Sequence, residues 1–568
     1  MTWHYKNEVY SIKEYFLRNM KVESLEDIND WFRKSKNHKY RIDGIKESCQ
    51  LIHKFKDKQI TICGDYDVDG VTATTILLLC LTWLGFEHVN YRIPKRFSEG
   101  FGINRAMIDE ISSGLVITCD NGIAQPDVIS YAKRKGLTVI VTDHHEPAII
   151  DGKKILPEAD VVIDPNAIDD SADFNGYCGA GIVYRLACEL LEYDVLKCRK
   201  LMGLAAIGTV ADVMELRDEN YVIVRNGLRW VLNSSLTTTG LYALISSVGL
   251  TQHITAKDIG FKLGPVINAA SRMNDDGAKE AVELLAYEGE FSNAIPMAER
   301  LISYNEMRKL EKKDALTLAR TIVDNNCLYG DVPLVIYLPF VNEGIIGIIA
   351  GALCEEYKVP VICLTDVSED IYKGSARSCG NYNMKTELDK VADLLIKYGG
   401  HEGAAGLSLY RNNLDELTQR LHENACSFVS DNAISVEYDL KISAKEIPDV
   451  IEELEKYEPW GNGNPAPMFF IDKFSVMPRY GEFKTLIGND KSIVKMYSVN
   501  STAIGFDMVE EMRNVKQPKL LNLIGTLSDN YFCGKVEHVV EFTSFEEVSV
   551  SQKRTALAEK LSSMVLMS

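Results

Sequence analysis

The chain has 568 residues, a formal net charge of −19, 46% hydrophobic residues and 25% charged residues. Such a length predicts about three or four domains, and such a balance is typical of a soluble globular protein. No unbroken apolar stretch of about 20 residues is present, which excludes a membrane-spanning helix, and the N-terminus lacks the order of a signal peptide. The thirteen cysteines include no C-x-x-C pair, so the cytoplasm is the expected compartment.

The acidic net charge by itself argues against a nucleic-acid enzyme, because phosphate contacts are usually made by a basic surface. The acidic excess nevertheless includes carboxylates that bound metal ions would neutralise, and basic patches such as 95–96 and 133–135 lie within it. A solvated surface is the simpler interpretation of each patch. Net charge therefore decides little about function.

The first 45 residues carry no signal that we can interpret, but residues 59–164 contain four short apolar runs. These runs, 59–64, 115–119, 138–142 and 160–164, are spaced widely enough for crossover helices, which predicts βαβ units and a parallel sheet. The side chains that follow the runs in turn are Asp65, Asp67 and Asp69; Asp120; Asp143, His144 and His145; and Asp164. Because ligands bind beyond the carboxyl ends of parallel strands, we expect one site built from several loops.

Asp67 and Asp69 stand two residues apart after the first run. An extended backbone there would point both carboxylates to one side, which is the arrangement that hard divalent cations prefer. Gly70 would then allow a tight exit into a helix that begins near Val71, whose amino end favours a phosphate. A solvated turn is an equally good interpretation of this D-x-D-G sequence.

Asp120 is equally ambiguous, because Asp-Asn-Gly is also a favourable turn sequence. The pair His144-His145 is more informative, since it places two of the ten histidines side by side at another strand end. Imidazoles with several carboxylates suit Mn²⁺, and Mg²⁺ is tolerated where most ligands are oxygen. Asp212 follows an apolar segment and could be a helix cap or a ligand.

The rest of the chain predicts further domains. Residues 178–300 are mainly helical in pattern, a long polar helix follows at about 297–325, and strand and helix alternation resumes after it. Short β-rich runs from about 434 predict a small β-barrel, for which an OB-fold is a candidate. The expected fold is therefore a multidomain α/β protein divided into a segment 1–45, a parallel-sheet domain 46–296, a connector helix 297–330, a second α/β domain 331–430 and an OB-like β-barrel 434–550.

Four sequences, GDYDVDG (64–70), TCDNG (118–122), TDHHE (142–146) and GTVAD (208–212), occur in the order and spacing of the DHH phosphoesterase family, which this chain resembles. GSARSCGNYN (374–383) and KYGGHEGAAGLSL (397–409) look like the substrate-binding domain associated with that family. EPWGNGNPAPMFF (458–470) resembles the entry to a terminal OB-fold. The likeness extends over about 45–545, and the terminal barrel favours the branch of the family that degrades single-stranded DNA.

The resemblance implies roles for individual residues. It implies two Mn²⁺ or Mg²⁺ ions, with Asp120 bridging them, held by the ligands Asp67, Asp69, Asp120, His144 and Asp212. It places three further side chains in catalytic positions close behind, namely His145, Asp65 and Asp143. It implies substrate contacts for Arg272, Asn305, Arg308, Ser375, Arg377, Gly399, Gly400 and His401.

The activity that the resemblance implies is 5′-to-3′ exonucleolytic cleavage of single-stranded DNA into 5′-mononucleotides, in DNA repair and recombination. The implied partners are single-strand-binding protein and a RecQ-type helicase. The chain departs from the family pattern at Val266, where a phosphate-binding arginine is usual, and at Val341-Asn342, where Trp-His is usual. A DHH phosphodiesterase that acts on short oligonucleotides, and a homologue that binds single strands without cleaving them, are the alternatives.

Overall fold

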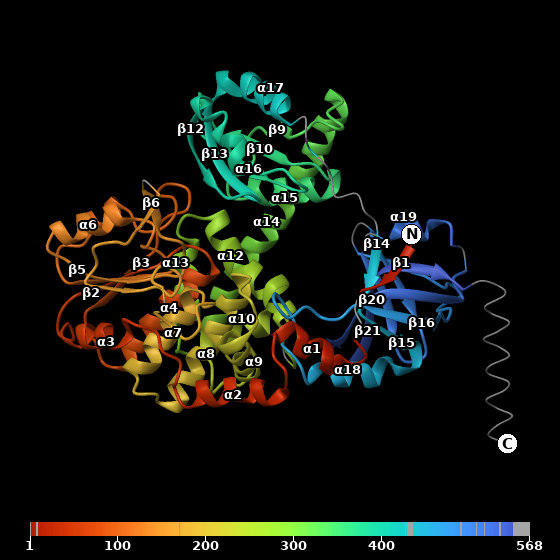
Figure 1. The fold of residues 1–568 in the computed structure, drawn as a ribbon, viewed down its shortest axis with the longest axis horizontal. Coiled ribbons are helices and arrows are strands. Elements are labelled where there is room, and N and C mark those ends of the chain that lie inside the picture. The colour runs from red at the N-terminus through yellow and green to blue at the C-terminus, as the bar shows by residue number, and fades with distance from the viewer. Residues whose placement is uncertain are drawn as a thin grey trace.

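The computed structural model describes residues 2–548 except 7–8, 151, 170, 251, 426–427, 429–434, 489–490, 507, 516 and 533–534. Figure 1 shows three bodies: a large one coloured red to green, a second above it, and a third beside it formed by the end of the chain. Within the described residues, no helix combines the length and apolar character that crossing a bilayer would need.

The first body is built on a five-stranded sheet of order β3-β2-β4-β5-β8 in which every pairing is parallel. Its strands are β2 (Ile60–Cys63), β3 (Val89–Arg92), β4 (Leu115–Cys119), β5 (Thr138–Thr142) and β8 (Val161–Ile163). The four predicted strands are confirmed, and β3 is an edge strand that the sequence pattern missed. β2 and β4 are buried along their whole length, as expected for parallel strands covered on both faces.

Helices cover this sheet and extend it into a helical half. The helices nearest the sheet are α3 (Ile45–His53), α4 (Val68–Trp83), α5 (Arg105–Glu110) and α6 (Pro126–Arg134). The helical half contains α7 (Gly179–Leu190), α8 (Val195–Ala211), α9 (Asp218–Val231), α10 (Thr239–Ser247), α12 (Gly264–Met273) and α13 (Gly277–Leu285). α4 is apolar all round and packs against both α7 and α8, so it joins the sheet and the helical half in one core.

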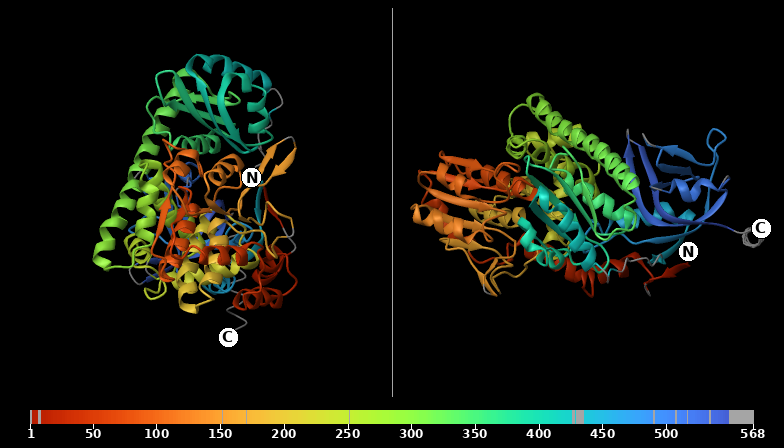
Figure 2. Two further views of the ribbon diagram at one scale, coloured as in Figure 1. Left: turned by 90° about the vertical axis from the view of Figure 1, so that its left-hand side faces the viewer. Right: turned by 90° about the horizontal axis from the view of Figure 1, so that it is seen from above.

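The predicted connector is the 36-residue helix α14 (Phe291–Asn326), which runs along one side of the molecule in Figure 2. Buried residues near its start, such as Ala298, belong to the first core, and buried residues near its end, such as Ala319, belong to the core of the second body. One helix therefore contributes to both hydrophobic cores. This arrangement couples the position of the second body to the first.

The second body is a mixed sheet of order β12-β13-β11-β10-β9, in which only the β9 and β10 pairing is parallel. Its strands are β9 (Leu334–Tyr337), β10 (Val361–Asp366), β11 (Ile371–Arg377), β12 (Leu395–Gly400) and β13 (Ala404–Tyr410). Its helices include α15 (Ile346–Tyr357), α16 (Met384–Asp389) and α17 (Leu414–Asn424). The predicted second α/β domain is thus an α/β body with a largely antiparallel sheet.

The third body is a seven-stranded sheet of order β15-β16-β20-β21-β19-β18-β17. Its strands are β15 (Leu440–Ser443), β16 (Phe469–Ser475), β17 (Thr485–Ile487), β18 (Ile493–Tyr497), β19 (Thr502–Phe506), β20 (Leu520–Phe532) and β21 (Lys535–Glu547). Met477, just after β16, forms an antiparallel bridge with Tyr497 of β18, so the chain after one strand reaches the far side of the sheet. Such curling is the mark of a small β-barrel.

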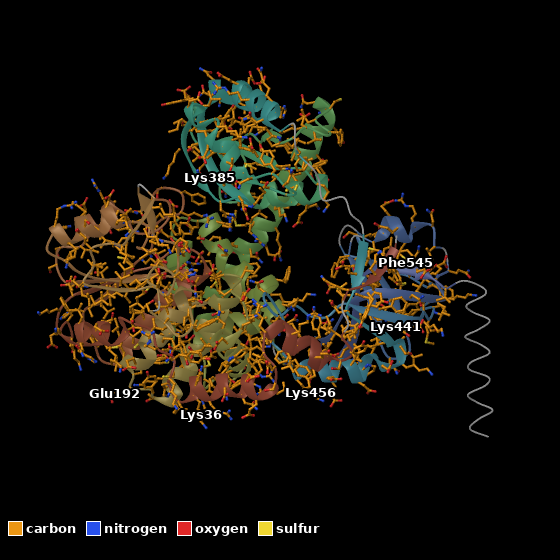
Figure 3. All side chains as sticks on the ribbon, in the orientation of Figure 1. Lys36, Glu192, Lys385, Lys441, Lys456 and Phe545 are labelled. Atoms are coloured by element: carbon orange, nitrogen blue, oxygen red, sulfur yellow. The ribbon has the colours of Figure 1, made fainter. Side chains whose placement is uncertain are left out.

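The N-terminal residues join this third body. β1 (Thr2–Tyr5) pairs in parallel with β14 (Ser435–Tyr438), and α1 (Ile12–Met20) and α2 (Leu25–Lys36) bury apolar side chains in the core that lies beneath the terminal sheet. The first and third bodies also touch directly, because Arg225 of α9 donates to the backbone oxygen of Lys456, which Figure 3 labels. Chain ends that are far apart in sequence therefore share one core.

We expect Phe16→Ala to lower the free energy of unfolding of the third body by about 3–5 kcal/mol, because the ring is 1% exposed and leaves a cavity when removed. Its centroid lies 4.9 Å from that of Tyr457 and 6.3 Å from that of Trp460, so tryptophan fluorescence during guanidinium unfolding reports on this site. Tyr10→Ala is the control, since Tyr10 is 82% exposed. An unchanged unfolding midpoint for Phe16→Ala would contradict this packing.

Candidate metal centre

Two of the acidic residues after β2 lie at the start of helix α4. Asp67 is the N-cap of α4 and its carboxylate accepts a hydrogen bond from the Gly70 amide at 3.0 Å, while Asp69 lies in the first helical turn. The prediction of an extended backbone is confirmed at Asp67 (φ −86°, ψ −175°) but is wrong at Asp69, which is helical because α4 begins at Val68 and not near Val71. The amino end of the helix, with its partial positive charge, brings the two carboxylates together.

Asp120 lies at the centre of the cluster. It follows β4 with a left-handed backbone (φ 64°) and is 1% exposed. Its Oδ1 is 3.2 Å from Nε2 of His144 and 3.9 Å from Nδ1 of His145. The same Nε2 of His144 lies 3.8 Å from Asp69 and 3.5 Å from Asp212, which is the C-cap of α8. Residues from four separate segments therefore meet within a few ångströms.

Three groups of side chains have ligand atoms that all lie within 4.8 Å of one another. These groups are Asp65, Asp67 and Asp120; Asp69, His144 and Asp212; and Asp120, His144 and His145. Among the described residues, Asp65 Oδ2, Asp120 Oδ1 and His144 Nε2 are buried and form no hydrogen bond. Buried polar atoms rarely go unpaired, so these lone pairs fit metal ligation. A set of carboxylates with one or two imidazoles suits Mn²⁺ or Mg²⁺.

Burial and neighbouring negative charges raise the pKa values of three carboxyl groups in the cluster. Burial, with the neighbouring charge of Asp67, raises the pKa of Asp65 to about 8. Burial and then the charge of Asp69 raise the pKa of Asp212 to about 8, and the same causes raise the pKa of Asp120 well above its usual range. So many buried like charges are compatible with full ionisation only when cations lie among them.

The two histidines of the cluster differ in charge. Burial lowers the pKa of His144, which favours the neutral imidazole that a metal ligand requires. Burial also acts to lower the pKa of His145, but its 2.7 Å contact with the Asp143 carboxylate outweighs this and raises the pKa to about 9. Burial acts to raise the pKa of Asp143, yet the same contact and the amide of Ile123 leave it lowered. His145 is thus a cation beside the cluster.

The start of α7 supports the cluster, and sequence reasoning missed it. The amides of Gly179 and Ala180 donate to the two oxygens of Asp69 at 2.6 and 2.8 Å. A Cβ at position 179 would lie only 2.5 Å from the Cβ of Asp120, so glycine is required there. The signal in the sequence was the small-residue run Gly179-Ala180-Gly181 at a predicted helix start, which a search for charged ligands overlooks.

Asp164, the acidic residue after the fourth predicted strand, also lies near the cluster. Its Oδ1 accepts hydrogen bonds from the amides of Asn166 and Ala167, and the Asn166 side chain donates to the backbone oxygen of His144 at 2.6 Å. Burial and then the charge of Asp143 raise the pKa of Asp164 to about 7. Asp164 therefore supports the loop that carries His144.

Three of the predicted substrate-binding residues lie where the first and second bodies meet. Arg272 of α12 donates to the backbone oxygen of Gly344 in the second body at 2.9 Å. Burial and then the positive charges of Arg96 and Arg308 lower its pKa to about 9, so three arginines stand close together. Asn305 of α14 is 5% exposed with an unpaired Oδ1. This junction is locally cationic within an acidic protein.

The remaining predicted contacts lie in the second body. Arg377 of β11 donates to the hydroxyl of Ser375 at 3.2 Å, and burial lowers its pKa. Gly399 and Gly400 form the end of β12, and Nδ1 of His401 accepts a hydrogen bond from the Gly403 amide. Within the described part of the chain, the hydrogen bonds and strand pairings of these three residues stay in the β12–β13 hairpin.

The two departures from the family pattern differ in kind. Val266 is 3% exposed and packs in the first core, so this position does not face solvent. Asn342 lies at the junction, where its side chain accepts from the Gly344 amide at 2.8 Å and donates to the backbone oxygen of Arg272 at 3.4 Å. Asn342 thus ties the second body to the helix that carries Arg272.

The parallel sheet with its acidic cluster, followed by a second α/β body, defines a DHH-type phosphoesterase. Family models match over residues 59–209 (DHH family, N-terminal domain), 331–425 (DHHA1 domain) and 438–542 (RecJ OB domain). The single-stranded-DNA-specific exonuclease RecJ of Haemophilus influenzae is 30% identical over 80% of this chain and 81% of that protein. RecJ of Bacillus subtilis is 32% identical over 86% of this chain and 62% of that protein.

A crystal structure of RecJ in complex with Mn²⁺ from Thermus thermophilus has a TM-score of 0.71 at 26% identity, covering 90% of this chain and 72% of that one. The chain therefore belongs to the RecJ family. The multidomain fold that we predicted is confirmed, including the OB domain at the end of the chain.

Metal binding should strengthen as pH rises. At pH 6, Asp65 and Asp212, with a pKa of about 8 each, carry protons that a metal ion must displace. Because these folded pKa values lie above the unfolded value of about 4, both groups stabilise the metal-free fold at low pH, and this contribution is lost as pH rises through 8. We therefore expect Mn²⁺ to raise the melting temperature more at pH 8.5 than at pH 6.

Differential scanning calorimetry with and without Mn²⁺ at both pH values measures this difference. Asp212→Asn should reduce both the Mn²⁺ effect and its pH dependence, whereas Asp127→Asn, at an exposed position in the first turn of α6, should change neither. An Mn²⁺ effect that is equal at the two pH values, or larger at pH 6, would contradict the protonated cluster.

Gly179→Ala should weaken Mn²⁺ binding by about 10–100-fold, the usual effect of disturbing the residues that orient metal ligands. The added methyl would overlap the Cβ of Asp120 and push its carboxylate away from both ligand groups. Gly351→Ala is the matched control, because that glycine also lies in a helix but has open space where a Cβ would go. Titration calorimetry with Mn²⁺ gives the affinities, and equal values for the two variants would refute the steric argument.

Proposed function

We propose that the chain is a metal-dependent exonuclease that degrades single-stranded DNA from the 5′ end and releases 5′-mononucleotides, acting in DNA repair and recombination. The observation that carries this proposal is the cluster around Asp120, which offers unpaired oxygen and nitrogen ligands at the ends of parallel strands. Membership of a family whose curated relatives are named single-stranded-DNA-specific exonucleases supports the substrate.

The predicted ligands would hold two Mn²⁺ or Mg²⁺ ions, namely Asp67, Asp69, Asp120, His144 and Asp212. Asp65, which was predicted as a catalytic residue behind them, would be a further ligand beside Asp67 and Asp120. Two such ions, when bound, polarise the scissile phosphate, activate the attacking water and stabilise the departing oxygen. The side chains of the cluster are fixed before substrate arrives, because they are buried. Gly179 also holds two of them, since its amide donates to Asp69 and its Cα packs against Asp120.

His145 would act on the substrate itself. The Asp143 carboxylate keeps its imidazole protonated, since the contact raises the pKa of His145 to about 9 against the effect of burial. A cation at the edge of the cluster can donate a hydrogen bond to a phosphate oxygen and supply a proton to the leaving 3′ oxygen. Asp143 would then be a positioning residue.

The strand would run through the junction of the first and second bodies. Arg272, Asn305 and Arg308 would contact its phosphates, and the fork of Arg377 with Ser375 would grip the terminal phosphate. Gly399, Gly400 and His401 would line the same passage. Aromatic rings of the OB domain would stack bases without reading their identity.

We further propose the domain division predicted above: 1–45, 46–296, 297–330, 331–430 and 434–550. The matched family models lie inside the second, fourth and fifth of these ranges. We also propose the cytoplasm as the compartment, with single-strand-binding protein and a RecQ-type helicase as partners that supply single strands.

End-labelled single-stranded DNA tests the function. With Mn²⁺ or Mg²⁺, the wild type should release labelled mononucleotide at once from 5′-labelled DNA and only late from 3′-labelled DNA, and a chelator should abolish release. Asp120→Ala should lower the rate by about a thousandfold or more, because it removes the ligand that lies between Asp65 and Asp67 on one side and His144 on the other. The exposed-residue variant Asp127→Ala should cleave like the wild type.

Two outcomes would overturn the proposal in different ways. Cleavage confined to very short oligonucleotides would identify a DHH phosphodiesterase of the smaller kind. Tight binding of single strands with no cleavage under either metal would identify a binding protein.

A further inference from the structure

The segment between β3 and α5 carries an aromatic side chain that the metal centre does not use. Phe101 is 47% exposed although it lies beside the buried cluster. Its ring meets the ring of His145 edge to face, with centroids 5.8 Å apart and planes at 78°. It meets the ring of Tyr66 in the same manner, at 6.3 Å and 82°. Phe101 therefore stands at the mouth of the metal site.

The exposure of Phe101 does not come from a loosely held loop. The amide of Gly102 donates to Asp65 Oδ1 at 3.2 Å, and the amide of Ile103 donates to the side chain of Asn121. Gly100 and Gly102 have φ angles of +83° and +68°, a left-handed conformation that suits glycine, so the backbone turns sharply on both sides of the ring. The backbone next to the ring is thus anchored to Asp65 of the metal cluster and to Asn121.

The earlier part of the same loop is tied to the rest of the first body. The Phe97 amide and the Ser98 hydroxyl both donate to the Asp275 carboxylate at 2.9 Å. Glu99 pairs with Arg92 of β3. The loop is anchored at both ends, and Phe101 between them is 47% exposed.

Arg96, on the same loop, is a positively charged side chain near Phe101, because both contact Tyr66. Its guanidinium stacks over the ring of Tyr66 at 4.5 Å and lies close enough to Arg272 to lower the pKa of that side chain. A cation and a half-exposed ring that both contact Tyr66 match the two parts of a single-stranded nucleotide, its phosphate and its base. Every base has a flat face, so such a surface binds without reading sequence.

We propose that Phe101 is a substrate-binding residue that stacks on the nucleobase flanking the scissile phosphate, and so fixes that nucleotide against His145 and the metal centre. This inference rests on the proposed nuclease function. The ring sits next to the imidazole that faces the cleaved bond, so the base it covers belongs to a nucleotide on one side of that bond.

Cleavage of abasic DNA tests the stacking directly. On an intact oligodeoxynucleotide, Phe101→Ala should lower kcat/KM about tenfold, the size expected for loss of one stacking ring. On an oligodeoxynucleotide whose first two nucleotides lack bases, wild type and Phe101→Ala should differ less than twofold. Phe101→Trp should retain activity on intact DNA, and Phe291→Ala, which removes a ring that is 41% exposed elsewhere, should behave as wild type.

A loss that is the same on intact and abasic DNA would overturn the proposal, because it would mean that the ring only supports His145 or the loop. No loss on intact DNA would overturn it as well. Melting temperatures and Mn²⁺ titrations of each variant show whether fold and metal centre are intact, and Phe101→Leu, which keeps apolar bulk without a flat ring, replaces Phe101→Ala if the latter fails to fold.

A binding measurement separates this inference from the nuclease function. An oligodeoxynucleotide with 2-aminopurine as its first two bases is mixed with the Asp120→Ala protein in Mg²⁺. Stacking should quench the fluorescence of the bound probe, and the double variant Asp120→Ala, Phe101→Ala should restore it by twofold or more at saturation. Equal quenching in both proteins would refute the role of Phe101 even if the wild type never cleaved DNA.

Discussion

The mutual repulsion of buried carboxylates is the constraint on which the rest of this structure depends. Asp65, Asp67 and Asp69 reach the same small volume as Asp120 and Asp212, and burial raises the pKa values of Asp65, Asp120 and Asp212 because water is excluded. Such a cluster is tolerable only if protons or metal ions reside in it. The site is therefore built for cations, and the phosphate chemistry follows from that.

The fold opposes this repulsion with backbone rather than with side chains. The carboxylate of Asp67 caps the amino end of α4. The carboxylate of Asp69 accepts hydrogen bonds from the amides of Gly179 and Ala180 at the amino end of α7. Fixed dipoles of this kind cost no reorganisation when substrate arrives, whereas lysines in the same places would compete with the metal ions. The side-chain pair of His145 and Asp143, 2.7 Å apart, lies at the edge of the cluster, where a proton is useful.

The acidic net charge and the nucleic-acid function are compatible because the positive groups are concentrated. Arg96, Arg272 and Arg308 gather at the junction of the first and second bodies, where Arg272 also reaches Gly344 across the boundary. The helix α14 contributes side chains to both cores and so fixes the position of the second body relative to the first. A local patch can thus bind a strand while the surface as a whole repels duplex and other polyanions.

The sequence by itself determined the parallel strands and offered candidate ligands at their ends, because apolar runs followed by Asp or His are local patterns with a known period, whereas Asp212 was singled out only by the family resemblance. It could not determine that Asp67 caps a helix, that Gly179 touches Asp120, or that Phe101 faces His145, since each depends on segments distant in the chain. The N-terminal residues are the clearest case: β1 and Phe16 are ordinary in sequence and acquire their roles only by pairing with β14 and packing on Tyr457. Period and composition are properties of neighbours along the chain, whereas caps, close approaches and shared cores are decided by which surfaces the fold brings into contact.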